Sequence, residues 1–159
     1  MSTSYETDVV AWAKEQAELI RNKRFDQLDL VHIAEEIDDV GKSEQRELAN
    51  RMAKLLMHLL KWEFQADHRT NSWTSTIKEQ RRAIIRRLVK TTSLKPSLTD
   101  ADWLEDVWLD ARNYASKETG IEFDDFPEAC HWKMDEVLQE DWLPGSPKAE
   151  RQTQEQRPQ

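Results

Sequence analysis

The chain has 159 residues, of which 34% are charged and 38% are hydrophobic, and its formal net charge is −8. This length suits one domain, and the acidic balance argues against attraction of the whole surface to nucleic acid or to anionic membranes. No apolar run approaches the ~18 residues that span a bilayer, and the polar N-terminus lacks the basic and apolar regions of a secretory signal. We therefore expect a cytoplasmic protein that neither spans nor binds a membrane.

The composition favours helices, because the chain has only three glycines and five prolines, the residues that form the tight turns between strands. A first helix is expected from about residue 5 to 23, where apolar residues recur at steps of three and four. These residues are Val9, Trp12, Ala13, Ala17 and Ile20. After a short connection, Asp29 is a good N-cap for a second helix. Its apolar stripe consists of Leu30, Ile33, Ile37 and Val40.

The end of this second helix is ambiguous in the sequence. Gly41 and Ser43 either break the helix or lie on the exposed side of a continuous one. Beyond them, apolar residues keep a four-three-four-three-four spacing that predicts a long central helix with a wide buried stripe. The stripe consists of Leu48, Met52, Leu55, Leu59, Trp62 and Ala66.

Two further helices are expected. Ser72 or Thr76 can cap the first, a basic helix over 72–90. A loop with the sequence SLKPSL follows, and Thr99 then caps a helix that ends at Gly120, a natural residue for a helix C-terminus. The remaining residues predict a loop with a short helix near 133–139. The fold class is therefore all-α: an antiparallel bundle of four principal helices with a long central helix, forming one domain over 1–144 and followed by a disordered tail over 145–159.

His32, Glu36 and His58 are the candidates for a metal site. His32 lies three and four residues before Glu35 and Glu36, so the three share one helical face, and helical bundles do bind metals through such groups. If one helix is continuous, His32 and His58 are about 39 Å apart, and if the chain folds back near Gly41 they are offset by about 12 Å. Neither geometry makes a site within one chain, so we expect hydrogen bonds at both histidines and no cofactor.

The basic helix is the candidate for nucleic-acid binding. Residues 51–95 hold eleven Lys and Arg against three acids, whereas residues 99–142 hold three against fourteen. The cations are Lys78, Arg81, Arg82, Arg86, Arg87 and Lys90. They could follow phosphates, but we favour ion pairs that are either solvated or internal, and the acids of the next helix are the candidate internal partners (Asp102, Glu105, Asp106 and Asp110).

The seven tryptophans divide into two groups. Four lie on faces expected to be buried: Trp12, Trp62, Trp73 and Trp108. Trp103 is offset from the stripe of its helix, and Trp132 and Trp142 lie in the acidic C-terminal region, so these three are candidates for a protein interface if they are exposed together. The lone Cys130 stands next to His131, a poor geometry for a nucleophilic pair.

Four segments have the character of family signatures: DLVHIAEEIDDVGKSEQREL at 29–48, HLLKWE at 58–63, SWTSTIKEQRRAI at 72–84 and EACHWKMDEVLQEDWLP at 128–144. In order and spacing they resemble the bacterial family catalogued as domain of unknown function 29. The resemblance implies an all-helical domain and assigns no activity, cofactor or catalytic residue.

Known catalytic motifs are missing, including Gly-rich phosphate loops and HExxH. The sequence favours a non-catalytic helical module that binds an unknown protein partner, with a homodimer as one possibility. A nucleic-acid-associated regulator and a metal-dependent enzyme are the two alternatives.

Overall fold

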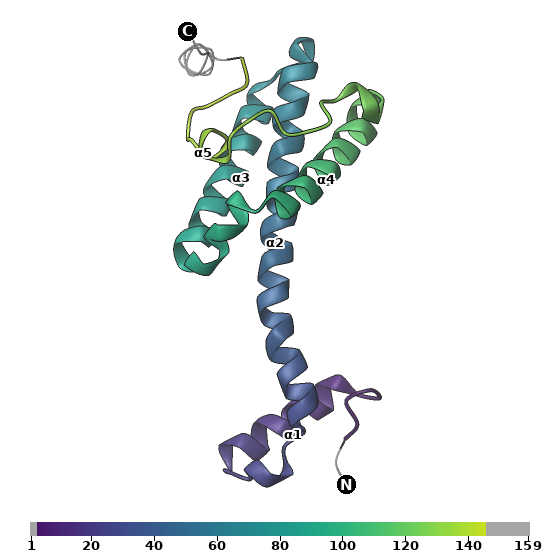
Figure 1. The fold of residues 1–159 in the computed structure, drawn as a ribbon, viewed down its shortest axis with the longest axis vertical. Helices are drawn as coiled ribbons and strands as arrows, with labels where there is room; N and C mark the ends of the chain where they lie inside the picture. Colours follow the sequence, from purple (N-terminus) through teal and green to yellow (C-terminus); the bar gives the residue numbers. More distant parts are fainter. Residues whose placement is uncertain (1–2, 146–159) are drawn as a thin grey trace. The chain divides into compact units, whose positions relative to one another are not determined.

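A computed structural model describes residues 3–145, and these residues form helices and connections with no strand. Figure 1 labels the five α-helices: α1 (Val9–Arg21), α2 (Leu30–Phe64), α3 (Asn71–Lys90), α4 (Ala101–Thr119) and α5 (Met134–Val137). Short 3-10 helices connect them: η1 (Phe25–Gln27), η2 (Ala66–His68), η3 (Thr92–Thr99) and η4 (Phe123–Asp125). The all-α fold class is thus confirmed, and the predicted tail lies outside the described residues from position 146 onward.

The chain divides into two compact units, Met1–Glu44 and Gln45–Gln159, called unit 1 and unit 2 below. The boundary falls inside α2, which runs through Gly41 without a break. The ambiguity at Gly41 is thereby resolved in favour of one continuous helix. The antiparallel four-helix arrangement and the single domain stay predictions. None of the helices between residues 3 and 145 combines the length and the apolar character that a membrane crossing requires.

Unit 1 contains α1, η1 and the first part of α2. Asp8 caps α1 by accepting a hydrogen bond from the backbone N–H of Ala11 at 3.0 Å. Asp29 begins α2 as predicted, because its Oδ1 accepts from the N–H of His32 at 3.4 Å. Within residues 3–44, only Trp12 and Gln16 are buried. This unit therefore has very little apolar core of its own.

The helix starts of unit 2 differ from the sequence prediction by one to a few residues. Thr70 caps α3, because its hydroxyl oxygen accepts a hydrogen bond from the N–H of Trp73 at 3.4 Å. Thr76 lies inside the helix and donates its hydroxyl hydrogen bond to the carbonyl of Ser72. Asp100 caps α4 by accepting a hydrogen bond from the N–H of Trp103 at 3.0 Å. The predicted cap, Thr99, instead donates its hydroxyl hydrogen bond to the carbonyl of Pro96 at 3.2 Å. The expected loop SLKPSL is largely the 3-10 helix η3.

The core of unit 2 is built on the predicted central stripe. Leu48, Met52, Leu55 and Leu59 are each fully buried, with exposed fractions of 0%. They pack with residues of α3, η3, α4 and the C-terminal segment: Ile77, Ile84, Leu88, Leu94, Val107, Trp108, Ala111, Ala115, Phe126, Val137 and Trp142. At Gly120 the chain turns out of α4 with φ at 77°, a backbone conformation that favours glycine.

Candidate interaction surface

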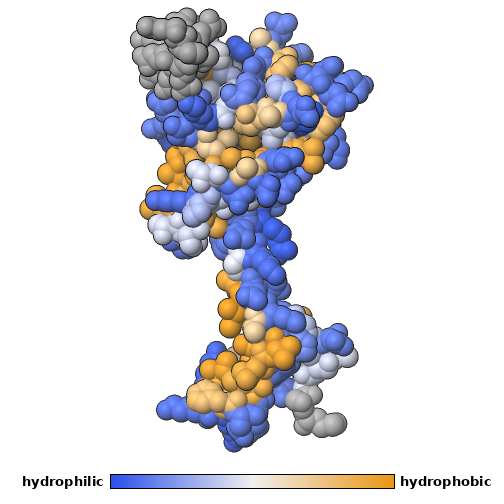
Figure 2. Space-filling model, in the orientation of Figure 1, coloured by the Kyte–Doolittle hydropathy of each residue, from blue (hydrophilic) through white to orange (hydrophobic). Residues whose placement is uncertain are grey.

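Unit 1 leaves much of its apolar surface uncovered. Eight large apolar side chains are between 46% and 68% exposed: Val9, Val10, Ile20, Phe25, Leu30, Val31, Ile37 and Val40. Figure 2 shows hydrophobic surface on the side of this unit that faces the viewer, over α1 and the first part of α2. We call the exposed apolar surface to which these eight residues contribute the apolar face. Single exposed apolar residues are ordinary on protein surfaces, but a contiguous group usually marks an interaction site.

A polar and aromatic cluster holds α1 and the preceding segment against α2. The Asp29 carboxylate accepts a hydrogen bond from Trp12 Nε1 at 3.0 Å and contacts His32 Nδ1 at 2.7 Å. Tyr5 donates its hydroxyl hydrogen bond to Glu36 and stacks on the His32 ring, with the ring centroids 4.2 Å apart. We call these five residues the Tyr5 cluster. It fixes the unit through directional contacts where apolar burial is scarce.

The hydrogen bonds of the Tyr5 cluster shift the pKa values of its members. The bond to Asp29 raises the pKa of His32 above 6.5, and the same bond lowers the pKa of Asp29 below 3.8. The bond to Glu36 raises the pKa of Tyr5 to about 12. The carboxylates of Asp29 and Glu36 therefore accept hydrogen bonds from Trp12 of α1 and from Tyr5 of the segment that precedes α1.

The predicted metal candidates lie in different units: His32 and Glu36 belong to unit 1, and His58 belongs to unit 2. Nδ1 of His32 already contacts Asp29, and Glu36 accepts from Tyr5. Among residues 3–145, no group of three or more His, Cys, Asp or Glu side chains has an arrangement that could hold a metal ion.

His58 lies in unit 2 beside a shallow cavity. The cavity has a volume of about 400 Å³ and is lined by Lys54, Met57, His58, Tyr114, Lys117 and Glu118. Burial lowers the pKa of His58, and its Nδ1 has no hydrogen-bond partner among the described residues. The predicted hydrogen bond is not assigned to either nitrogen of His58, so it stays a prediction for Nε2. The neighbouring Glu118 pairs with Lys61 at 2.7 Å.

Arg81 of the basic helix has a structural role that the sequence did not reveal. Its side chain is 2% exposed and donates hydrogen bonds to the backbone carbonyls of Val137, Glu140 and Trp142 at 2.8, 2.6 and 2.8 Å. Burial lowers the pKa of this guanidinium below its ordinary value. Arg81 thus fastens the C-terminal segment to α3 and is not available to a phosphate.

The other cations of α3 have varied surroundings. Lys78, Arg82 and Arg86 line a groove of about 310 Å³ together with Ile85 and Glu140. Arg82 and Arg87 find carboxylates at Glu140 (3.5 Å) and Glu47 (3.7 Å), and Lys90 is exposed. The ion pairs described for Arg82 and Arg87 are internal, with the C-terminal segment and α2.

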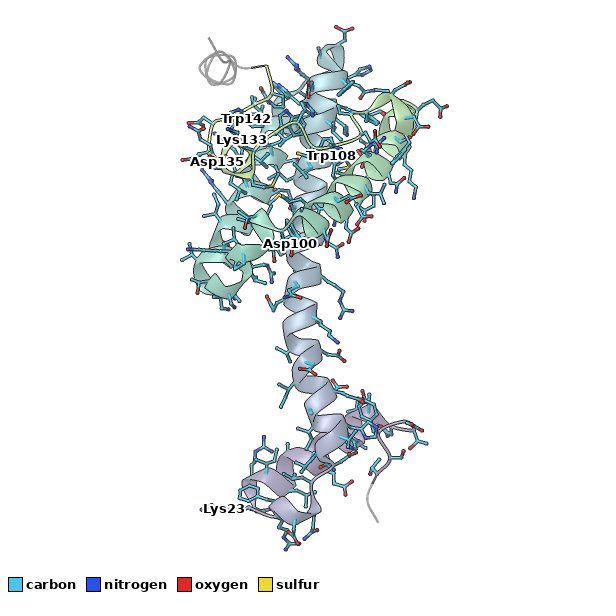
Figure 3. The ribbon with its side chains drawn as sticks, in the orientation of Figure 1. Lys23, Asp100, Trp108, Lys133, Asp135 and Trp142 are labelled. Carbon is cyan, nitrogen blue, oxygen red and sulfur yellow. The ribbon has the colours of Figure 1, made fainter. Side chains whose placement is uncertain are left out.

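The three candidate interface tryptophans are not exposed together. Trp142 is 3% exposed, and Trp103 and Trp132 are half-buried. Trp132 contacts the rings of Trp108 and Trp142 edge to face, with centroids 5.6 and 5.8 Å apart; Figure 3 labels the latter two. Trp132 and Trp142 belong to an aromatic part of the core, and Trp103 packs against the core, so the condition set for an exposed interface is not met.

Cys130 and His131 do not form a nucleophilic pair. Burial raises the pKa of the Cys130 thiol to about 11, and its Sγ donates to the carbonyl of Trp132. His131 Nε2 instead contacts Glu63 Oε2 at 2.9 Å. A thiol with this pKa is almost wholly protonated at neutral pH and is a weak nucleophile.

Comparison with known proteins gives a family and no characterised relative. The model of the family described as "Domain of unknown function DUF29" matches residues 4–143, so the chain belongs to this family. No curated protein and no solved structure matches the chain.

Proposed function

We propose that this DUF29 protein is a non-catalytic helical module that binds a protein partner through the apolar face of unit 1. The observation that carries the proposal is the contrast within residues 3–44, where two residues are buried and eight large apolar side chains are exposed. A unit of this composition gains little from its own core. It gains substantially when another protein covers its exposed apolar residues.

The Tyr5 cluster supports the proposal because it holds together the two helices that carry the surface. Hydrogen bonds and a stacked ring hold α1 to the start of α2, so the apolar residues of the two helices are displayed on a fixed support. A partner that binds such a surface loses little free energy to ordering it. The polar groups of the cluster are engaged with one another, which suits a structural role better than proton transfer to a substrate.

Exposed acids alternate with the apolar residues of α2 in the sequence, among them Glu35, Asp38 and Asp39. They give unit 1 a negative charge outside its apolar residues. Charges that lie outside the centre of an interface influence the association rate and the choice of partner.

The proposal can be tested by affinity purification of the tagged full chain from its own organism, followed by mass spectrometry. The wild type is compared with Ile37→Asp, which places a charge on a residue that is 67% exposed and should not disturb folding. Arg82→Ala is the matched control on the basic helix. Each sample is divided into nuclease-treated and untreated halves.

We expect stoichiometric partners that resist nuclease, persist with Arg82→Ala and disappear with Ile37→Asp. Circular dichroism should give the same helix content for all three chains. Partners that vanish with nuclease and with Arg82→Ala would instead identify the basic helix as the functional surface. Partners that persist with Ile37→Asp would contradict the assignment to unit 1.

A further inference from the structure

The apolar residues of the first part of α2 form a seam with a specific period. Leu30, Ile33, Ile37 and Val40 are separated by three, four and three residues, which is the spacing of a coiled-coil stripe and places all four along one side of the helix. Leu30, Ile37 and Val40 are 66%, 67% and 67% exposed, and Ile33 is half-buried. We call these four residues the α2 seam. The described chain covers it only partly.

Small residues border the α2 seam on one side. Ala34 and Gly41 each directly follow a seam residue, at the positions that flank a helix contact, and both are exposed. A Cβ placed on Gly41 would meet no atom within 4 Å, so nothing in this chain requires glycine there. Glycine inside a helix is destabilising. A glycine at position 41 would let a neighbouring helix approach α2 closely, which no contact within this chain requires.

The charges around the α2 seam point away from it or are already engaged. At 100° per residue, Glu35 and Asp39 project from the opposite side of α2. Glu36 and Asp29 border the seam on its other flank, and their carboxylates accept hydrogen bonds within the Tyr5 cluster. The four side chains of the seam are themselves uncharged. A second apolar stripe of the same period therefore fits them.

We propose that a second copy of this chain covers the α2 seam, so that two α2 helices pack against each other through Leu30, Ile33, Ile37 and Val40. This inference rests on the proposed function, because it names the partner of the same face. A symmetric pair places identical surfaces in contact, and either helix orientation brings apolar residues of one seam against apolar residues of the other. Ala34 and Gly41 then leave room for the close approach of the helices.

The first test is the mass of the full-length protein over a concentration series, measured by sedimentation equilibrium. The chain has a mass of 18.8 kDa, so the expected pair has twice that mass, 37.6 kDa. Ile37→Asp should weaken the association by about 100-fold or more, because symmetry places two charges in one apolar contact. Lys42→Asp introduces the same side chain at an exposed position off the seam and should leave the association unchanged.

The second test is disulfide crosslinking in a Cys130→Ala background, which removes the chain's one native thiol. Ile37→Cys alone should crosslink if the helices are parallel, and a mixture of Ile33→Cys with Ile37→Cys should crosslink if they are antiparallel. Either product supports the proposal. Glu35→Cys, on the opposite side of α2, is the control and should give no crosslinked pair.

A wild-type chain that stays at 18.8 kDa throughout the series, or a pair that survives Ile37→Asp and gives no seam crosslink, would overturn the inference. The same variant separates this failure from failure of the proposed function. If the wild type is monomeric but Ile37→Asp still loses its captured partner, the face binds another protein and only the second copy is excluded. If the partner also survives Ile37→Asp, both proposals fail.

Discussion

The sharpest stability prediction concerns Arg81, whose guanidinium joins α3 to the C-terminal segment. Arg81→Ala removes three hydrogen bonds to backbone carbonyls, and those to Val137 and Trp142 are buried. A hydrogen bond to a charged group contributes about 1.5–3 kcal/mol, so the two buried bonds alone correspond to about 3–6 kcal/mol. The bond to Glu140 adds less, because water can replace it at that partly buried position. We expect a loss of about 3–6 kcal/mol or slightly more in the free energy of unfolding.

The assay is urea denaturation followed by tryptophan fluorescence, which reports on the segment because Trp132 and Trp142 lie in it. Arg82→Ala is the control: this neighbouring side chain is 63% exposed and its 3.5 Å pair with Glu140 should contribute at most about 1 kcal/mol. Arg81→Lys should fall between the two, since one ammonium group cannot reach three carbonyls at once. Equal denaturation midpoints for Arg81→Ala and Arg82→Ala would refute the reasoning.

Four further predictions concern pH, helix propensity, thiol reactivity and local unfolding. The attachment of α1 should be strongest between pH 3.8 and pH 6.5, the ordinary pKa values of Asp29 and His32. The pKa of His32 is raised, so its contribution is lost as the pH rises through the raised value. The pKa of Asp29 is lowered, so its contribution is lost as the pH falls through the lowered value. NMR titration of His32 and of the α1 amides checks this, and an α1 signal that ignores the titration would contradict it. In an Ile37→Asp background, Gly41→Ala should raise the free energy of unfolding by about 0.5–1 kcal/mol in urea denaturation, because the added Cβ has open space, and destabilisation would show a contact that we have not identified. Cys130, with a pKa of about 11 against an ordinary 9.0, should have about 100-fold less thiolate than a free cysteine and react with iodoacetamide correspondingly slowly; a normal rate would mean that the thiol is not buried. Amides of α1 should exchange with deuterium well before those of α3, since unit 1 has few buried residues, and equal protection would argue for one cooperative unit.

Most of the helices could be predicted from the sequence because their signals are local. The stripe from Leu48 to Trp62, the cap at Asp29 and the turn at Gly120 each depend on residues within a few positions of one another. The starts of α3 and α4 could not be fixed in the same way, because several hydroxyl and carboxyl side chains compete there to cap the helix. The continuity of α2 through Gly41 was undecidable from propensity alone, since one glycine costs too little to break a helix with strong apolar patterns on both sides.

The roles of individual polar residues were harder to predict, because they depend on contacts distant in sequence. Arg81 looks like its basic neighbours until the C-terminal segment, 56 to 61 residues away, places three carbonyls around it. Tyr5 meets Glu36 across 31 positions. The Asp29 and His32 pair, at a spacing of three, was the one part of the Tyr5 cluster that the sequence alone could have indicated. An apolar stripe likewise predicts that one face of a helix is buried, but it does not indicate whether the residues that bury it belong to the same chain or to another one.

The magnitudes indicate what kind of association the α2 seam can support. Burying a Leu, Ile or Val side chain completely contributes about 1.5–3 kcal/mol, so each of the three seam residues that are about two-thirds exposed contributes about 1–2 kcal/mol. Six such side chains in two copies give about 6–12 kcal/mol, and association itself costs about 4–15 kcal/mol. The two ranges overlap, and the most favourable balance is about 8 kcal/mol (12 − 4), so a pair held by the seam alone has a dissociation constant in the micromolar range or weaker unless exposed residues of α1 take part. Such a pair exchanges readily, and another protein with an apolar helix can compete for the same face. Because the balance is so small, one buried aspartate per copy exceeds it, which is why Ile37→Asp tests both proposals.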